Sequence, residues 1–248
     1  MKKLIHFGLR KLGYRIVRIE DGPRPSEGLD PFLKLLKQFG FSPKHILDIG
    51  ANRGLWTREA IKLFPDARYM LVEPQNHLKT YIQDLLDQGC KIQWINAGAS
   101  DRSGTLPFTI TNSDGSCSFA YTAAQARAAG FQQIDVHVKT VNEVVASAGG
   151  DLPDMVKIDA EGLDLKVLAG SSDLLGKTDI FLVEAIIRGE GAYENSLPQV
   201  LKFMRNAGYQ LVDITDLNRS PKYGLLWLCE LAFLRNGSTL FDAASGYE

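Results

Sequence analysis

The chain has 248 residues, of which 45% are hydrophobic and 23% charged, so it is long enough for one well-buried domain and short for two. Its net charge of -1 and pI of about 6.4 exclude the overall basic field that drives binding to nucleic-acid backbones. The three cysteines are far apart, without CxxC spacing, and predict neither a disulfide framework nor a structural zinc site. This cysteine usage fits a reducing cytosol, where we expect the protein.

The first 28 residues differ from the rest of the chain. Residues 1–20 are basic and amphipathic, and residues 21–28 hold two prolines and two glycines, which predicts a helix followed by a linker. The apolar runs of this helix are too short to span a bilayer. Two interpretations stay open: the helix packs on the domain, or it contacts an anionic membrane surface and holds the protein peripherally at the membrane. The compact domain is expected over residues 29–248.

From residue 30 onward, helical and strand patterns alternate along the chain. Hydrophobic periodicity predicts helices at 30–40, 55–64 and 77–89, and strands at 45–50, 68–73 and 91–99. Successive strand-then-helix units connect through right-handed crossovers. The pattern therefore predicts an α/β fold with a doubly wound, mostly parallel sheet and helices on both of its faces.

The middle third of the chain breaks this alternation. Short alternating strands at 105–111 and 133–141 flank a polar turn and an Ala-rich helix within residues 113–130, which predicts an inserted segment. Regular alternation resumes afterwards, with helices at 162–170 and 197–207 and strands at 154–159, 178–185, 208–214 and 225–235.

The stretch DIGANRG, from Asp48 to Gly54, joins the first predicted strand to a helix. It lies at the carboxyl edge of the sheet, where ligands of open α/β sheets bind. Gly50 allows a sharp turn and a close approach of the backbone to a ligand, and Gly54 allows the helix to begin close to the strand. The exposed amides of that helix N-terminus favour an anionic or carboxylate group.

The two glycines have the spacing G-x-x-x-G, which differs from the patterns of dinucleotide-binding turns and of P-loops. This argues against pyrophosphate binding and against a nicotinamide-dependent oxidoreductase. Glu73 ends the second predicted strand, 25 positions after Asp48. An acidic side chain at that place can accept hydrogen bonds from both hydroxyls of a ribose. The turn and Glu73 together predict an adenosine-type cofactor.

Three stretches, DIGANRG, LVEP and VKIDAEGLDLKVLAG, together resemble the FkbM-type methyltransferases, a branch of the S-adenosylmethionine-dependent class. The resemblance covers about residues 47–214. It implies a Rossmann-like class I methyltransferase fold, S-adenosyl-L-methionine as cofactor, and O-methylation of a hydroxyl on a sugar, a glycan or glycolipid, or a natural-product scaffold. It also implies a set of cofactor-binding residues: Asp48, Gly50, Asn52, Gly54 and Thr57 at the turn, Glu73 on the ribose, and Pro74, Ala99 and Ser100 flanking the adenine.

Three carboxylates lie near the ends of later strands. Asp159 ends the strand at 154–159, Glu161 follows two residues later, and Glu184 ends the strand at 178–185. We expect these side chains beside the first strand's end, where one of them acts as the base for a hydroxyl acceptor. A magnesium site is the less favoured alternative, and no residue is assigned as a metal ligand. Helix capping or interaction with a helix dipole is the structural alternative for Asp159 and Glu161.

Other residues have weaker claims on function. Lys157, on a strand expected to be buried, must reach the sheet edge or pair with a carboxylate. A lone histidine such as His137 in an alternating strand is more often structural than catalytic. Specificity commonly resides in loops, so an acceptor pocket is expected from two segments: Ser116, Ser118 and Tyr121 in the inserted loop, and Arg188 and Tyr193 after the Glu184 strand.

Two further functions can be compared with O-methylation. A non-catalytic cofactor-binding scaffold in a biosynthetic assembly is the alternative function, but carboxylates at two strand ends favour an enzyme. Nucleic-acid methylation is disfavoured, because the chain has no Asn-Pro-Pro-Tyr or Asp-Pro-Pro-Tyr signature and the core domain has no basic stripe with interleaved aromatic residues. The expected partner is a small-molecule or glycan acceptor, and the sequence predicts no oligomeric state.

Overall fold

The computed structural model describes residues 31–187, 195–220 and 222–240. The expected N-terminal helix and linker over residues 1–28 lie outside the described residues, and so do Arg188 and Tyr193. The domain boundary and the membrane contact therefore stay predictions. Within the described ranges, no helix is long and apolar enough to cross a membrane.

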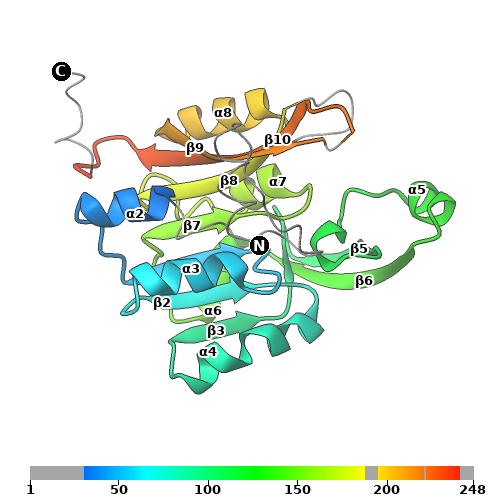
Figure 1. Cartoon of the computed structure of the whole chain (residues 1–248), viewed down its shortest axis with the longest axis horizontal. Coiled ribbons are helices and arrows are strands. Elements are labelled where there is room, and N and C mark those ends of the chain that lie inside the picture. Colours follow the sequence, from blue (N-terminus) through cyan, green and yellow to red (C-terminus); the bar gives the residue numbers. More distant parts are fainter. Residues whose placement is uncertain (1–30, 188–194, 221, 241–248) are drawn as a thin grey trace, which may run out of the picture.

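Seven strands form the central sheet, in the order β3-β2-β1-β7-β8-β10-β9 (Figure 1). Adjacent strands are parallel from β3 to β8, whereas β10 is antiparallel to both of its neighbours. The strands are β1 (His45–Ile49), β2 (Arg68–Val72), β3 (Ile92–Ile95), β7 (Met155–Ile158), β8 (Ile180–Ile186), β9 (Tyr209–Arg219) and β10 (Leu226–Arg235). The mostly parallel sheet is confirmed. Its order reverses between β1 and β7, the kind of position at which open α/β sheets bind ligands.

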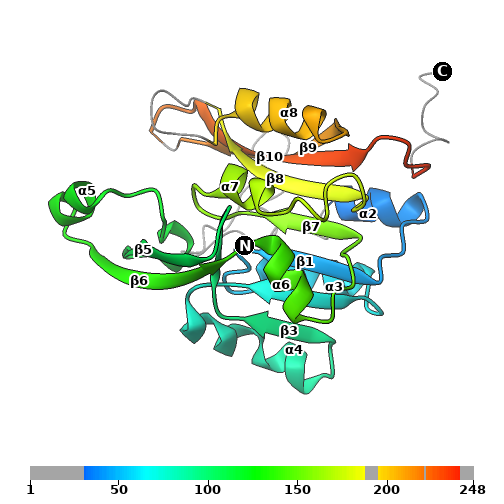
Figure 2. The same cartoon turned by 180° about the vertical axis from the view of Figure 1, so that it is seen from behind.

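Helices cover both faces of this sheet, as Figures 1 and 2 show from opposite sides. Ile46, Met155 and Leu182 belong to the apolar cluster of one face, which includes residues of α2 (Pro31–Gln38), α3 (Leu55–Leu63), η1 (Asn76–Ile82) and α4 (Gln83–Asp87). The next residue along each strand packs in the cluster of the other face, with α6 (Val141–Ser147), α7 (Asp164–Ala169) and α8 (Leu197–Asn206). Burial on both faces explains why the central strands are nearly continuous apolar runs.

The inserted segment forms a small sheet of its own, in the order β4-β6-β5. It extends away from the central sheet at the right of Figure 1. Its elements are β4 (Gly98–Ala99), β5 (Gly104–Ile110), η2 (Asp114–Ser116), α5 (Ala123–Ala128) and β6 (Gln132–Lys139). β5 and β6 pair in antiparallel register, as their alternating polar and apolar pattern predicts.

Three predicted details are wrong. The single strand expected at 91–99 is two strands in different sheets, since the chain turns at Asn96, whose amide donates to the carbonyls of Glu73 and Pro74. The strand expected at 133–141 ends at residue 139, because Thr140 caps the unpredicted helix α6 with a capping box. Glu184 lies inside β8 and does not end it, since pairing with β10 continues to residue 186.

Gly50 lies where the ends of β1 and β7 come closest. Its φ is +79°, and a Cβ atom built there would lie 1.8 Å from the carbonyl oxygen of Asp159. Its N–H donates to the carbonyl of Val72 at 2.9 Å, so the turn also hydrogen-bonds to β2. The expected close approach of Gly50 is real, but the group that it approaches is the backbone of Asp159.

We predict that Gly50→Ala lowers the free energy of unfolding by about 3 kcal/mol or more, because it combines a left-handed backbone with overpacking. Gly40→Ala is the matched control: φ is +84° there, but nothing lies within 4 Å of the added Cβ, so only about 1 kcal/mol is expected. Urea unfolding of both variants measures the difference. Equal decreases in the free energy of unfolding of the two variants would show that the contact with Asp159 is unimportant.

Candidate active site

A cleft of about 1530 Å³ lies at the carboxyl ends of the parallel strands. Most of the predicted site residues line it, namely Asp48, Gly50, Asn52, Glu73, Pro74, Ala99, Asp159, Glu161 and Glu184. Gly54, Thr57 and Ser100 do not line this cleft. Each of these three residues contacts a neighbouring group in place of the cleft.

Thr57 supports Asp48, and the other two fix the packing of backbone turns. The Thr57 hydroxyl donates to Asp48 Oδ2. A Cβ atom on Gly54 would lie 2.5 Å from the Ile82 side chain, so Gly54 allows α3 to begin close to η1. The carbonyl of Ser100 would lie 2.2 Å from a Cβ atom on Gly170, which places the Ser100 backbone against the end of α7.

Asp48 offers the cleft a free acceptor atom. Its side chain is 1% exposed, and Oδ1 has no hydrogen-bond partner among the described residues, whereas Oδ2 accepts from Thr57. Burial raises the pKa of Asp48, and the positive charge of Lys157 opposes that shift. A buried acceptor without a partner is costly, so this atom is suited to a ligand that brings a donor, such as an ammonium group.

Glu73 is held in a fixed plane by two backbone groups. Its Oε2 accepts from the N–H of Asn52 and its Oε1 from the N–H of Gln75, both at 2.9 Å, and the side chain is 3% exposed. Burial raises the pKa of Glu73, and these hydrogen bonds lower it. A carboxylate oxygen can accept more than one hydrogen bond, so both oxygens retain capacity for ligand hydroxyls.

The tip of the inserted segment closes the cleft above Glu73. The carbonyl of Asp114 accepts from Asn52 Nδ2 and from Gln75 Nε2, both at 3.1 Å. The Asp114 carboxylate forms an ion pair with Arg53 at 2.6 Å, and this pairing lowers the pKa of Asp114. The contacts tie the insertion to the same residues that hold Glu73.

The insertion also contacts the turn after β7. The Ser118 hydroxyl donates to the carbonyl of Glu161 at 2.7 Å, and Ala120 packs against Gly162. Cys117 and Phe119 line the cleft, whereas Ser116, Ser118 and Tyr121, expected in an acceptor pocket, do not. The insertion therefore forms a wall of the cleft through residues next to the predicted ones.

The three carboxylates beyond β7 and in β8 differ in their surroundings. Burial raises the pKa of Glu161 to about 8, with the negative charge of Asp159 as the second cause. Burial, followed by the charge of Asp159, also raises the pKa of Glu184. At neutral pH both glutamates hold protons. Glu161 has a φ of 51°, a rare conformation for a residue with a side chain, and such outliers cluster at functional sites.

Lys157 pairs with carboxylates, as its position on a buried strand predicts. Its Nζ donates to Asp159 Oδ2 at 2.9 Å and lies 4.0 Å from Glu230 Oε2. The pairing carboxylates raise the pKa of Lys157 against the effect of burial, so this ammonium stays charged. Asp159 thus combines an adjacent cation with a side chain that is 34% exposed to the cleft.

The last two strands contribute cleft residues that no sequence pattern predicts. Glu230 of β10 and residues 215–219 of β9 line the same cleft. These residues form no motif, and the run DITDLNR has only its unusual polarity for a strand as a signal. His137 is exposed on β6 outside the cleft. Within the described part of the chain, no group of three or more His, Cys, Asp or Glu side chains has metal-site geometry.

Residues 48–211 match the model of the methyltransferase FkbM domain. This span begins at Asp48 and includes Glu73, the insertion and the turn that carries Asp159 and Glu161. The chain belongs to the FkbM methyltransferase family. It is therefore a methyltransferase, and the family implies S-adenosylmethionine as the methyl donor.

One sequence relative and two solved structures are similar to this FkbM methyltransferase. The 2-O-methyltransferase NoeI of Sinorhizobium fredii is 25% identical over 164 residues, which are 62% of this chain and 67% of NoeI. A precorrin-6y C5,15-methyltransferase from Geobacter metallireducens matches 82% of this chain and 85% of its own at 14% identity and a TM-score of 0.45. The 1,6-didemethyltoxoflavin-N1-methyltransferase of Burkholderia thailandensis, solved with S-adenosylhomocysteine, matches 85% and 80% at 14% identity and a TM-score of 0.43.

The protonation of Glu184 predicts a pH-dependent stability of this FkbM methyltransferase. Because its pKa is raised on folding, the native state binds the proton more tightly, and stability falls as pH rises above about 5. Glu184→Gln removes this dependence. The free energy of unfolding of the variant, relative to that of the wild type, should therefore rise with pH by up to about 1.4 kcal/mol per pH unit. Urea unfolding between pH 5 and 9 measures the effect.

Glu143→Gln is the matched control for this experiment. Hydrogen bonds from Ser103 and Thr140 lower the pKa of Glu143, so its contribution should be constant over the same pH range. A difference between wild type and Glu184→Gln that does not change with pH would contradict a protonated Glu184.

Proposed function

We propose that the protein is an S-adenosylmethionine-dependent O-methyltransferase that acts on a hydroxyl of a sugar, a glycan or another polyhydroxylated scaffold. One observation carries the proposal: Asp159, a carboxylate paired with a lysine, lines the same cleft as the buried acceptors Asp48 and Glu73. NoeI is a 2-O-methyltransferase, which is consistent with a hydroxyl acceptor.

The chain's residues fit the proposed cofactor. Asp48 Oδ1 is a buried acceptor without a protein partner, which suits the ammonium group of the cofactor's amino-acid part. Glu73 is oriented by two N–H groups and would accept from the ribose hydroxyls. Pro74 and the small residues Ala97, Gly98 and Ala99 leave room for a flat ring. When bound, S-adenosylmethionine supplies an electrophilic methyl group on a sulfonium.

Asp159 would accept the proton of the acceptor hydroxyl. Its side chain is 34% exposed, and Lys157 Nζ holds Oδ2 at 2.9 Å, which leaves Oδ1 for the acceptor. Glu161 and Glu184 hold protons at neutral pH, so they would donate hydrogen bonds to acceptor oxygens. Alignment of the hydroxyl and exclusion of water are the remaining tasks of the cleft.

We predict that Glu73→Ala weakens binding of S-adenosylmethionine and S-adenosylhomocysteine by about 1 to 3 kcal/mol, the range for hydrogen bonds to a charged group. Isothermal titration calorimetry measures the affinity. Asp66→Ala is the control, since Asp66 is exposed and does not line the cleft. Equal affinity of wild type and Glu73→Ala would remove Glu73 from the cofactor site.

We predict that Asp159→Asn lowers the rate of methyl transfer by about 100-fold or more and leaves cofactor affinity nearly unchanged, because it keeps the shape of the side chain and removes the base. Consumption of methyl donor is measured against a panel of glycans, glycolipids and polyketide alcohols. A chelator should have no effect under this assignment. If Asp159→Asn and Glu184→Gln both keep full turnover on a confirmed acceptor, the assignment of the base is wrong, and proximity alone, with solvent taking the proton, becomes the better account.

A further inference from the structure

Ionisable side chains form a row across five strands on one face of the central sheet. Asp48 of β1 is in register with Lys157 of β7. Glu184 of β8 is in register with Glu230 of β10, which is in register with Asp216 of β9. Partners in register point to the same face, and residues two apart on a strand share that face. All five of these residues line the cleft.

The two ends of this face have different chemistry. Towards the amino ends of the strands, Ile46, Met155 and Leu182 pack in the apolar cluster that includes α2 and α3. Two residues further along each of these strands, the same face carries the charged residues Asp48, Lys157 and Glu184. Of the described helices, α2 and α3 bury only the apolar half, so the charged half forms a floor of the cleft.

The outer end of the floor lies on β9 and has an unusual backbone. The register between β9 and β10 shifts between the Glu230 and Leu231 positions, so Thr215 is an extra residue in its strand. Such bulges redirect side chains. The Thr215 hydroxyl donates to Glu230 Oε1, and Asn218 Nδ2 donates to Asp216 Oδ2 at 3.0 Å. The bulge therefore collects hydrogen-bonding groups at the rim of the cleft.

We propose that Thr215, Asp216 and Asn218 form the acceptor subsite and that it takes the ring of a neutral sugar. This inference rests on the proposed function, and it assigns acceptor recognition to β9. The other end of the same floor carries Asp48 Oδ1, the buried acceptor atom proposed above to bind the cofactor, so the two proposed sites share one cleft. Asp159 lies between the two ends.

The donor and acceptor groups of the subsite fit vicinal hydroxyls. Asp216 accepts hydrogen bonds, the Asn218 amide both donates and accepts, and the neighbouring Arg219 donates. Asp216 and Asn218 are exposed and line the cleft, so their remaining hydrogen-bonding capacity faces it. A flat aromatic acceptor would require an apolar slot, and Leu217 is the one apolar side chain among residues 215–219.

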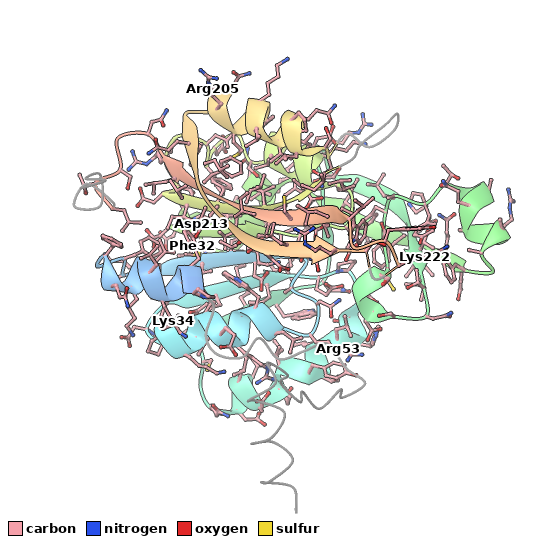
Figure 3. All side chains as sticks on the ribbon, turned by 45° about the horizontal axis from the view of Figure 1, so that its top comes forward. Phe32, Lys34, Arg53, Arg205, Asp213 and Lys222 are labelled. Atoms are coloured by element: carbon pink, nitrogen blue, oxygen red, sulfur yellow. The ribbon has the colours of Figure 1, made fainter. Side chains whose placement is uncertain are left out.

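The same strand provides a matched control. Asp213 is also exposed on β9, and its partner in register is Ala232, on the face that carries Glu230. It does not line the cleft. Figure 3 shows Asp213 on the strand pair in front, above Phe32 and Lys34 of α2. Asp213→Ala therefore tests whether loss of any β9 carboxylate has the same effect as loss of Asp216.

The experiment titrates the full-length protein with methyl α-D-glucopyranoside, methyl α-D-galactopyranoside and methyl α-D-mannopyranoside, and with catechol as a flat probe. Saturation-transfer NMR measures the Kd with and without S-adenosylhomocysteine. At least one glycoside should bind, and catechol should not. Asp216→Ala and Asn218→Ala should raise the glycoside Kd by about 10-fold each, whereas Asp213→Ala leaves it unchanged. The affinity for S-adenosylhomocysteine should be the same in all four proteins.

Three outcomes would overturn the subsite: binding of catechol but of no glycoside, absence of any glycoside binding, or equal effects of Asp216→Ala and Asp213→Ala. A wild-type protein that fails to bind S-adenosylhomocysteine contradicts the proposed function instead. The titration without that ligand keeps the two failures distinguishable. Thermal unfolding of each variant verifies that the edge strand is folded.

Discussion

The close packing of Gly50 against the carbonyl of Asp159 is the constraint on which the site depends. It brings the turn after β1 and the turn after β7 within backbone contact. Asp48 precedes the first turn, and Asp159 begins the second, so the spacing between the proposed cofactor contacts and the proposed base is set by backbone atoms. No side-chain adjustment can relax this contact, which explains why a residue without a Cβ atom is needed there.

Charge compensation is the second organising feature. The cleft gathers Asp48, Asp159, Glu184 and Glu230 around a single buried ammonium, that of Lys157. One cation cannot neutralise four carboxylates, so burial drives protonation of the glutamate farther from it. The result is a division of roles between neighbouring carboxyl groups, with Asp159 beside the cation and Glu184 as a hydrogen-bond donor. Environment alone produces this difference between chemically similar side chains.

The inserted segment forms one wall of the cleft. Asp114 binds the residues that hold Glu73, and Ser118 binds the backbone of Glu161. One short stretch, residues 113–118, thus contacts both the proposed cofactor end and the proposed catalytic end of the cleft. Residues of β9 form another part of the cleft lining, and the bulge in this strand presents polar groups at the rim. Specificity for the acceptor would then come from two segments outside the parallel core.

The parallel core, the insertion and the motifs at the ends of β1, β2 and β7 are predictable from the sequence alone. These are local features: strand periodicity, a glycine turn, and acids at fixed distances along the chain. The need of Lys157 for a carboxylate partner was also predictable, because a buried ammonium must be paired. The Thr140 capping box is a local pattern too, so helix α6 is predictable from the sequence although it is not among the expected elements.

Which of these residues come into contact is visible only in the folded protein. Strand order and register bring Gly50 to Asp159 and Asp114 to Asn52. They also place residues 215–219 in the cleft. Contacts between residues far apart in the chain leave no local pattern. The raised pKa of Glu184 likewise cannot be predicted from a local pattern, since it depends on burial and on charged neighbours from other parts of the chain. Sequence patterns report the geometry of one element at a time, whereas the site arises from the packing of several elements around the end of one sheet.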